Sequence, residues 1–252
     1  MRYYYGRVYV VIFLGQLVKK FTMDRWLGKY ALVTGANSAL SQAIIQRLLD
    51  AGINVVAVDK SEPVKKLSGA GQFHFKAYDL SKEDDVWNIF IWIEENFGGV
   101  DILINNADFA LNQTLLDGES KGWSDVVNTN IMSYIISTKE FLRGNADRDL
   151  EVGHIVNISN LYGYRNPVNS GLNFYAATQH AITHYNRHLR IELELRDSPV
   201  KVTCISPCID PYKDDLNQID LKDTADAVFY ALDTPYHLQV YEVMLESFDT
   251  YE

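Results

Sequence analysis

Residues 34–43 read TGANSALSQA and could hold the pyrophosphate of a dinucleotide. They lie between an apolar run and a segment with helical spacing, and a helix that begins after such a turn presents backbone N–H groups that bind phosphate. Gly35 supplies the tight turn. The next apolar run ends at Asp59, whose carboxylate could accept hydrogen bonds from the adenosine ribose and would repel a 2′-phosphate. One glycine and one aspartate also fit a simpler alternative, an ordinary turn and a solvated side chain.

The histidines of one predicted helix form a second group with chemical potential. His180, His184 and His188 recur every four residues and share one stripe of the helix. Two histidines at this spacing can hold a metal ion. No motif supplies a third ligand, so we expect solvated imidazoles at an altered interface and no metal site. Cys204 and Cys208 lack zinc spacing, and two cysteines are too few for a disulfide framework, which indicates a reducing compartment.

The elements that must position these residues alternate along the chain. Runs rich in β-branched residues predict strands at residues 30–34, 53–59, 73–79, 100–105, 154–159, 200–207 and 239–245. The stretches between them predict helices at residues 40–51, 82–96, 124–143, 174–196 and 223–232. Strands alternating with crossover helices predict an α/β fold: a Rossmann-type, doubly wound, seven-stranded parallel sheet in a single domain. A ligand of such a sheet binds at the carboxyl ends of its strands.

Composition limits the classes of function. The chain has 252 residues, of which 47% are hydrophobic, as expected for one α/β domain with a substantial core. The net charge of -10 argues against nucleic acid as a partner, because nucleic-acid binding needs a basic surface. From the small number of cysteines we expect a cytoplasmic protein.

Residues 1–22 differ from the rest of the chain. They contain an apolar run at residues 8–14, with arginines before it and lysines after it. This run is too short to span a bilayer, which takes about 20 apolar residues, and no small-residue cleavage site follows it. We therefore expect an N-terminal extension outside the fold at residues 1–22, the only part suited to membrane contact, and a single domain at residues 23–252.

Further motifs follow the predicted strands and open two helices, in this order: Asp79-Leu80, Asn105-Asn106-Ala107, Asn130 and Tyr175. In this order and spacing the chain resembles the short-chain dehydrogenase/reductase family, from Met23 almost to the C-terminus. Stretches such as MDRWLGKYALVTGA, GGVDILINNA, GHIVNIS, FYAAT and CISP are most similar to the insect farnesol-dehydrogenase-like branch.

The resemblance implies hydride transfer between a nicotinamide and an alcohol or carbonyl compound, with Tyr175 as acid or base and Asn130 as a second catalytic residue. Because the ordinary pKa of tyrosine is about 10, the family places a lysine four residues later, which lowers that pKa and binds the nicotinamide ribose. Gln179 stands at this position and carries no charge. Asn160 replaces the serine that orients the substrate, although its amide can still donate a hydrogen bond. The adjacent Ser159 is expected to point the other way. The resemblance thus implies a degenerate active site.

The same resemblance implies a set of cofactor-binding residues: Thr34, Gly35, Leu40, Asp59, Asp79, Leu80, Asn106, Ala107 and Pro207. Two glycines of the family's turn are replaced by Ala39 and Ser41, which are expected to crowd the pyrophosphate and the helix–strand contact. Asp108 replaces another glycine and adds negative charge beside the cofactor, and Cys208 replaces the glycine after Pro207. We expect weak binding of NAD, preferred over NADP because of Asp59.

Two functions stay open at this point. One is an NAD(P)-linked oxidoreductase that acts on an alcohol/carbonyl pair with reduced activity, and the other is a catalytically inactive nucleotide- or partner-binding scaffold. The loop at residues 209–222 is acidic and offers little apolar surface for an isoprenoid substrate. A homo-oligomer is compatible with the resemblance, with an altered interface. In the first case, Gln179→Lys combined with Asn160→Ser should raise activity.

Overall fold

The computed structural model describes residues 23–247 except 64, 147, 149–151 and 213–218. The prediction of an extension at residues 1–22 lies outside the described residues, as does the middle of the acidic loop. Within the described ranges, no helix is long and apolar enough to cross a bilayer.

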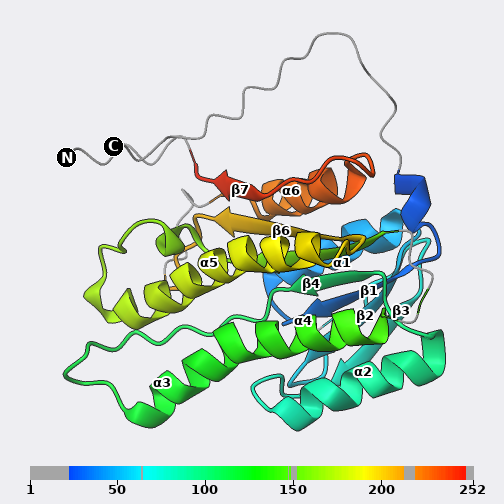
Figure 1. The fold of residues 1–252 in the computed structure, drawn as a ribbon. Coiled ribbons are helices and arrows are strands. Elements are labelled where there is room, and N and C mark those ends of the chain that lie inside the picture. Colours follow the sequence, from blue (N-terminus) through cyan, green and yellow to red (C-terminus); the bar gives the residue numbers. More distant parts are fainter. Residues whose placement is uncertain (1–22, 64, 147, 149–151, 213–218, 248–252) are drawn as a thin grey trace, which may run out of the picture.

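A parallel sheet of seven strands forms the centre of the molecule (Figure 1), in the order β3-β2-β1-β4-β5-β6-β7. The strands are β1 (Tyr30–Thr34), β2 (Asn54–Asp59), β3 (Phe73–Ala77), β4 (Ile102–Asn105), β5 (Gly153–Ile158), β6 (Val200–Pro207) and β7 (Glu242–Leu245). Every neighbouring pair is parallel. The order switches direction between β1 and β4, where a ligand of a doubly wound sheet binds. The predicted fold class is confirmed.

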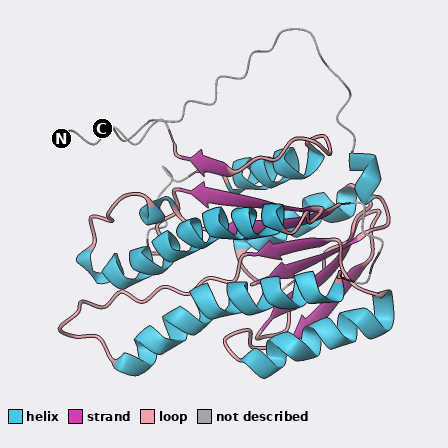
Figure 2. Cartoon of the chain, viewed as in Figure 1, coloured by secondary structure: helices cyan, strands magenta, loops and turns pink. Residues whose placement is uncertain are grey.

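Helices cover both faces of the sheet (Figure 2). The cluster on one face joins α1 (Ala39–Asp50) and α6 (Leu221–Asp233) to the strands. The cluster on the other face joins α2 (Glu83–Phe97), α4 (Ser133–Gly144) and α5 (Asn173–Leu195) to them. The shorter elements are η1 (Met23–Trp26), α3 (Ser120–Val127), η2 (Asn128–Met132), η3 (Leu161–Gly163) and η4 (Ser170–Leu172).

This layering explains the sequence of the strands. All residues of β4, β5 and β6 are buried, as is typical of a parallel sheet covered on both faces. Most of their side chains are apolar, and the buried polar ones include His154, Asn157 and Lys201. The edge strands β3 and β7 are half-exposed. The largest core side chains come from both clusters and include Ile44 and Leu48 of α1 and Phe141 of α4.

The helix predicted at residues 124–143 differs from the structure. It begins earlier, at Ser120, and a π-helical turn, η2, separates α3 from α4. In this turn the N–H of Ser133 donates to the carbonyl of Asn128, five residues earlier. Such turns recur at functional sites because they redirect side chains. Here the turn contains Asn130, one of the predicted catalytic residues.

Candidate active site

The turn after β1 brings the predicted cofactor-binding residues together at the carboxyl ends of β1 and β4. Gly35 has φ +65°, and a Cβ there would lie 2.7 Å from the Cα of Ala107. Only glycine tolerates both conditions. The Thr34 hydroxyl accepts hydrogen bonds from the N–H groups of Asn106 (2.9 Å) and Ala107 (3.0 Å). The turn therefore packs directly on the segment that follows β4.

The first turn of α1 can receive an anion. The Ser38 side chain caps the helix by accepting from the N–H of Ser41. The N–H groups of Ala39 and Leu40 have no acceptor within the helix, because the first N–H groups of any helix lack one. Backbone N–H groups of this kind bind phosphate. The first turn thus fits a pyrophosphate, with Ala39 in place of glycine.

Ser41 differs from the expectation that it would crowd the contact between helix and strand. It is fully buried, and its hydroxyl accepts from Asn106 Nδ2 at 2.7 Å. The hydroxyl also donates to the carbonyl of Thr34 at 3.4 Å. A hydrogen-bonded serine therefore fills the place of the family's glycine.

Two aspartates that are predicted to bind the cofactor lie at or just after the ends of β2 and β3. Asp59, at the end of β2, accepts from the N–H of Asn37 at 3.0 Å with one oxygen, Oδ2. Asp79 follows β3 and accepts from the N–H (3.2 Å) and the hydroxyl (2.7 Å) of Ser81. Burial acts to raise the pKa of Asp79, but the bonds from Ser81 and the nearby Lys82 hold it below its ordinary value. The Asp59 carboxylate is thus fixed beside the turn, and the Asp79 carboxylate is held by the residues that follow it. Leu80, which follows Asp79, is buried.

Tyr175 is bonded to a carboxylate. Its hydroxyl donates to Asp108 Oδ2 at 2.7 Å, and Gln179 Nε2 donates to Asp108 Oδ1 at 3.0 Å. The Ser159 hydroxyl in turn donates to Gln179 Oε1 at 3.1 Å, so the expectation that Ser159 points away from the site is wrong. Tyr175, Gln179 and Ser159 are all buried. The reason is that Ser159 lies beyond the end of β5, where the strict alternation of a strand no longer applies.

The electrostatics of this cluster are opposite to those of a tyrosine beside a cation. Burial raises the pKa of Tyr175 well above its ordinary value, and the charge of Asp108 raises it further, whereas a bond from Asn160 lowers it. Burial of the carboxylate raises the pKa of Asp108 to about 6, against the opposing effect of its bonds from Tyr175, Gln179 and the N–H of Phe109. Asp108 as a residue still has exposed surface. The desolvation therefore acts on the oxygens that contact the buried side chains.

The two asparagines hold the loops of the site in place. Asn160 is buried, accepts from the N–H of Tyr162 at 2.9 Å and donates to the carbonyl of Ile209. Asn130 bonds both backbone groups of Phe109, its Oδ1 accepting at 2.8 Å and its Nδ2 donating at 2.9 Å. Because Phe109 follows Asp108 directly, Asn130 fixes the segment that carries the carboxylate.

The bond between Asp108 and Tyr175 is the main feature that sequence reasoning missed. The sequence placed Asp108 only beside the cofactor. The sequence did contain one signal. Compared with the family pattern, the chain has lost a cation at Gln179 and gained an anion at Asp108, and both changes make the surroundings of Tyr175 more negative.

The histidine stripe and the cysteines give no further site. His180 Nδ1 donates to the carbonyl of Gly163 at 2.7 Å, and the rings of His184 and His188 lie 4.7 Å apart. No group of three or more metal-ligating side chains occurs among the described residues. Cys204 and Cys208 are both free thiols.

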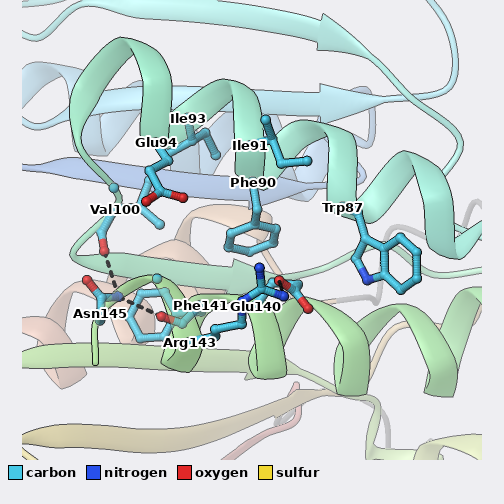
Figure 3. Close-up of a pocket in the computed structure, with 12 residues that line it drawn as sticks. Trp87, Phe90, Ile91, Ile93, Glu94, Val100, Glu140, Phe141, Arg143 and Asn145 are labelled. Atoms are coloured by element: carbon cyan, nitrogen blue, oxygen red, sulfur yellow. Dashed lines mark hydrogen bonds and ion pairs between the residues drawn. The ribbon is translucent and has the colours of Figure 1, made fainter. Parts of the chain in front are cut away.

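A pocket of about 240 Å³ lies between α2 and α4, away from these residues (Figure 3). Trp87 and Phe90 of α2 face Glu140 and Arg143 of α4, which form an ion pair at 3.4 Å. None of the predicted cofactor or catalytic residues lines it. It is a groove between two helices, separate from the candidate active site.

Comparison with known proteins agrees with this geometry. Residues 29–210 match the family described as short chain dehydrogenase. The chain is 33% identical over 248 residues to dehydrogenase/reductase SDR family member 11 of Mus musculus, covering 88% of this chain and 95% of that protein. It is 35% identical over 241 residues to farnesol dehydrogenase of Aedes aegypti, covering 89% and 98%.

A solved structure of similar fold is a short chain dehydrogenase from Leptospira borgpetersenii with bound NAD+. Its TM-score is 0.79 at 19% identity, and the match covers 92% of this chain and 96% of that one. The chain therefore belongs to the short-chain dehydrogenase/reductase family of Rossmann-fold oxidoreductases. Within that family it is close to the farnesol-dehydrogenase-like proteins, as the sequence motifs predicted.

Proposed function

We propose that the protein is an NAD-linked oxidoreductase that interconverts an alcohol and a carbonyl compound with reduced activity. The observation that carries this proposal is the position of Tyr175. Its buried hydroxyl donates to Asp108. Asp108 directly follows Ala107, whose N–H donates to Thr34 in the proposed dinucleotide turn. A proton-exchanging group and a dinucleotide site therefore adjoin one another, as hydride transfer with proton exchange requires.

The proposed cofactor is NAD rather than NADP. Gly35 and the first turn of α1 would hold the pyrophosphate, and Asp59 would accept from the adenosine ribose hydroxyls. A 2′-phosphate would meet the charge of Asp59 at the same place. When bound, the nicotinamide would supply the hydride acceptor or donor. The chain's own residues would orient the substrate and exchange its proton.

The proposed reduction in activity follows from the charge beside Tyr175. A cation lowers the pKa of a neighbouring tyrosine, whereas a carboxylate raises it. Gln179 supplies no cation, and Asp108 supplies a carboxylate at 2.7 Å from the Tyr175 hydroxyl. Forming a tyrosinate at neutral pH is therefore disfavoured in this site.

The proposed substrate is an alcohol with an apolar body. Phe174 precedes Tyr175 and packs on Trp123 of α3, with ring centroids 5.9 Å apart. Leu115 and Leu116, in the loop before α3, are 82% and 94% exposed. These loops offer apolar surface that the acidic segment at residues 209–222 lacks. Farnesol, the alcohol named for the mosquito relative, belongs in the first panel of substrates.

Two measurements on the purified protein test the proposal. Calorimetric titration with NAD, NADH and NADPH should give tighter binding of the forms without the 2′-phosphate. Oxidation of farnesol and a series of shorter alcohols should then be slow and should depend on Tyr175, with Tyr175→Phe as the control. Tighter binding of NADPH would overturn the cofactor assignment, and turnover that survives Tyr175→Phe would overturn the role of the tyrosine.

The engagement of Tyr175 and Gln179 by Asp108 favours a second candidate function, a nucleotide- or partner-binding scaffold without turnover. Under this alternative, NADH binds and no alcohol in the panel is oxidised by the native chain. We also propose that the protein acts in a reducing compartment such as the cytoplasm, consistent with its two free cysteines.

A further inference from the structure

The hydrogen bonds around Asp108 have a fixed direction. The hydroxyl of Ser159 donates to Gln179 Oε1, so the other end of that amide, Nε2, faces the carboxylate and donates to Oδ1. The second oxygen, Oδ2, accepts the proton of Tyr175. Because the phenol is the donor in this bond, its oxygen can still accept from an incoming hydroxyl group, beside the hydrogen bond that it receives from Asn160.

Among the residues that the structure describes, the hydrogen bonds that hold this carboxylate come from uncharged groups. Asn130 holds both backbone groups of the next residue, Phe109. Within the described ranges, the titratable group that acts on the Asp108–Tyr175 pair is Tyr134 on α4, whose hydroxyl donates to the carbonyl of Ile158 at 2.7 Å. Asp108 also has exposed surface, which gives a proton a route to solvent.

We propose that Asp108 is the proton acceptor behind Tyr175, so that the two side chains relay a proton without a free tyrosinate. This inference rests on the proposed function, and it replaces the cation-assisted tyrosine that the family resemblance implies. It gives a chemical role to the carboxylate that stands where the family has glycine.

The proposed step balances as follows. In alcohol oxidation the substrate O–H bond breaks and its proton passes to Tyr175 Oη, while the original Tyr175 proton passes to Asp108 Oδ2. The substrate C–H bond breaks as hydride, and its electron pair leaves with the nicotinamide as the two-electron acceptor. The carbonyl π bond forms from the electron pair of the broken O–H bond. Asp108 ends as a carboxylic acid and returns its proton to water.

The acid–base properties of the pair fit a concerted transfer. Burial and the charge of Asp108 hold the pKa of Tyr175 far above neutrality, so Tyr175 stays protonated before and after the step. The pKa of Asp108, raised to about 6 by burial, leaves it ionised at neutral pH and close to the pH at which a general base is most effective.

The sharpest test is Asp108→Asn, which keeps an acceptor for the Tyr175 hydroxyl and removes the base. We expect kcat for alcohol oxidation to fall about a hundredfold, the usual effect of losing one acid–base group. The rise of the native kcat through about pH 6 should disappear, while the dissociation constant of NADH changes by less than about threefold. Asp108→Glu should recover part of kcat, and Asp197→Asn, which removes an exposed carboxylate between α5 and β6, should change neither quantity.

A second readout needs no turnover. In the protein without nucleotide, the carboxyl carbon of Asp108 can be titrated by NMR after ¹³C labelling. Tyr175→Phe removes a bond that stabilises the carboxylate, so the pKa of Asp108 should rise in this variant. An unchanged titration would show that the pair is not coupled in solution and would overturn the relay.

The outcomes separate the relay from the proposed function. Native turnover that is equal or faster in Asp108→Asn, with the same pH profile, overturns the relay and leaves the oxidoreductase assignment standing. A faster Asp108→Asn variant would show that Asp108 inhibits turnover. Absence of native turnover over the whole panel, with the NMR coupling intact, overturns the proposed function and with it any catalytic use of the pair.

Discussion

The charge balance at Tyr175 leads to a prediction about repairing the site. Restoring the family's pair by Gln179→Lys and Asn160→Ser is the change that the sequence suggests. In the structure, Gln179 Nε2 lies 3.0 Å from Asp108 Oδ1, so a lysine at this position would meet the same carboxylate. The two charges would form an ion pair, and little net positive charge would act on Tyr175. The double variant should therefore gain little activity. Adding Asp108→Gly should let the charge of the lysine act on Tyr175 and so raise the activity.

The size of the effect follows from distances in the site. A unit charge about 4 Å away contributes about 4 kcal/mol at an effective dielectric constant of about 20. A cation and an anion at similar distances from the Tyr175 hydroxyl cancel, whereas the cation alone lowers its pKa. Asp108 has exposed surface, so water screens part of this interaction, and we expect a shift of roughly one to two pKa units, at about 1.4 kcal/mol each. This corresponds to roughly a 10- to 100-fold gain for the triple variant over the double variant.

The assay is NAD reduction at pH 8 with farnesol and a series of shorter alcohols, run on the native chain, Asp108→Gly alone, the double variant and the triple variant. Asp108→Gly alone should be slower than the native chain because it removes the relay. Tyr175→Phe added to the triple variant should abolish the gain. If the double variant already matches the triple variant, Asp108 does not neutralise the new cation and the charge argument is wrong.

Four further predictions concern cofactor choice and stability. Asp59→Ala should narrow the preference for NADH over NADPH in calorimetry, and an unchanged ratio would contradict the ribose assignment. Gly35→Ala should lower the free energy of unfolding by about 2 kcal/mol or more and should weaken NADH binding. The reason is that a Cβ at position 35 would lie 2.7 Å from the backbone of the segment after β4. Equal urea midpoints for the variant and the native chain would disprove this close approach. Lys201→Met should cost about 1–3 kcal/mol in urea unfolding, because Nζ donates at 2.7 Å to the carbonyls of Pro235 and Leu238. The Pro235 carbonyl would keep its bond from the N–H of Leu238, whereas the Leu238 carbonyl would lose the bond from Lys201. A loss below about 0.5 kcal/mol would count against this role. The raised pKa of Asp108 means that the folded chain binds the proton of this carboxyl more tightly than the unfolded chain does. The contribution of Asp108 to the free energy of unfolding therefore falls as pH rises from about 4 to about 6. Asp108→Asn should melt at a higher temperature than the native chain at pH 7 and at no higher temperature at pH 4.

The sequence by itself determined the fold, and it predicted which groups would react. Alternation of apolar strands and helices specifies the parallel sheet, because strands buried on both faces are rich in apolar residues. The strand β6 was predicted with the bounds that the structure shows, Val200–Pro207. The turn at Gly35, the carboxylate at Asp59 and the missing cation at Gln179 are also local features. Each depends on residues adjacent in the chain or on the end of a strand.

Only the tertiary structure decided how those groups are connected. Asp108 and Tyr175 are 67 positions apart, and their bond depends on how the segment after β4 is held against α5. That placement comes from Asn130 in a π-helical turn, and the sequence pattern there resembled an uninterrupted helix. The direction of a side chain beyond a strand end, as at Ser159, depends on local dihedral angles rather than on alternation. Contacts between distant segments are therefore set by packing, and this is why the charge balance at Tyr175 became visible only in the folded chain.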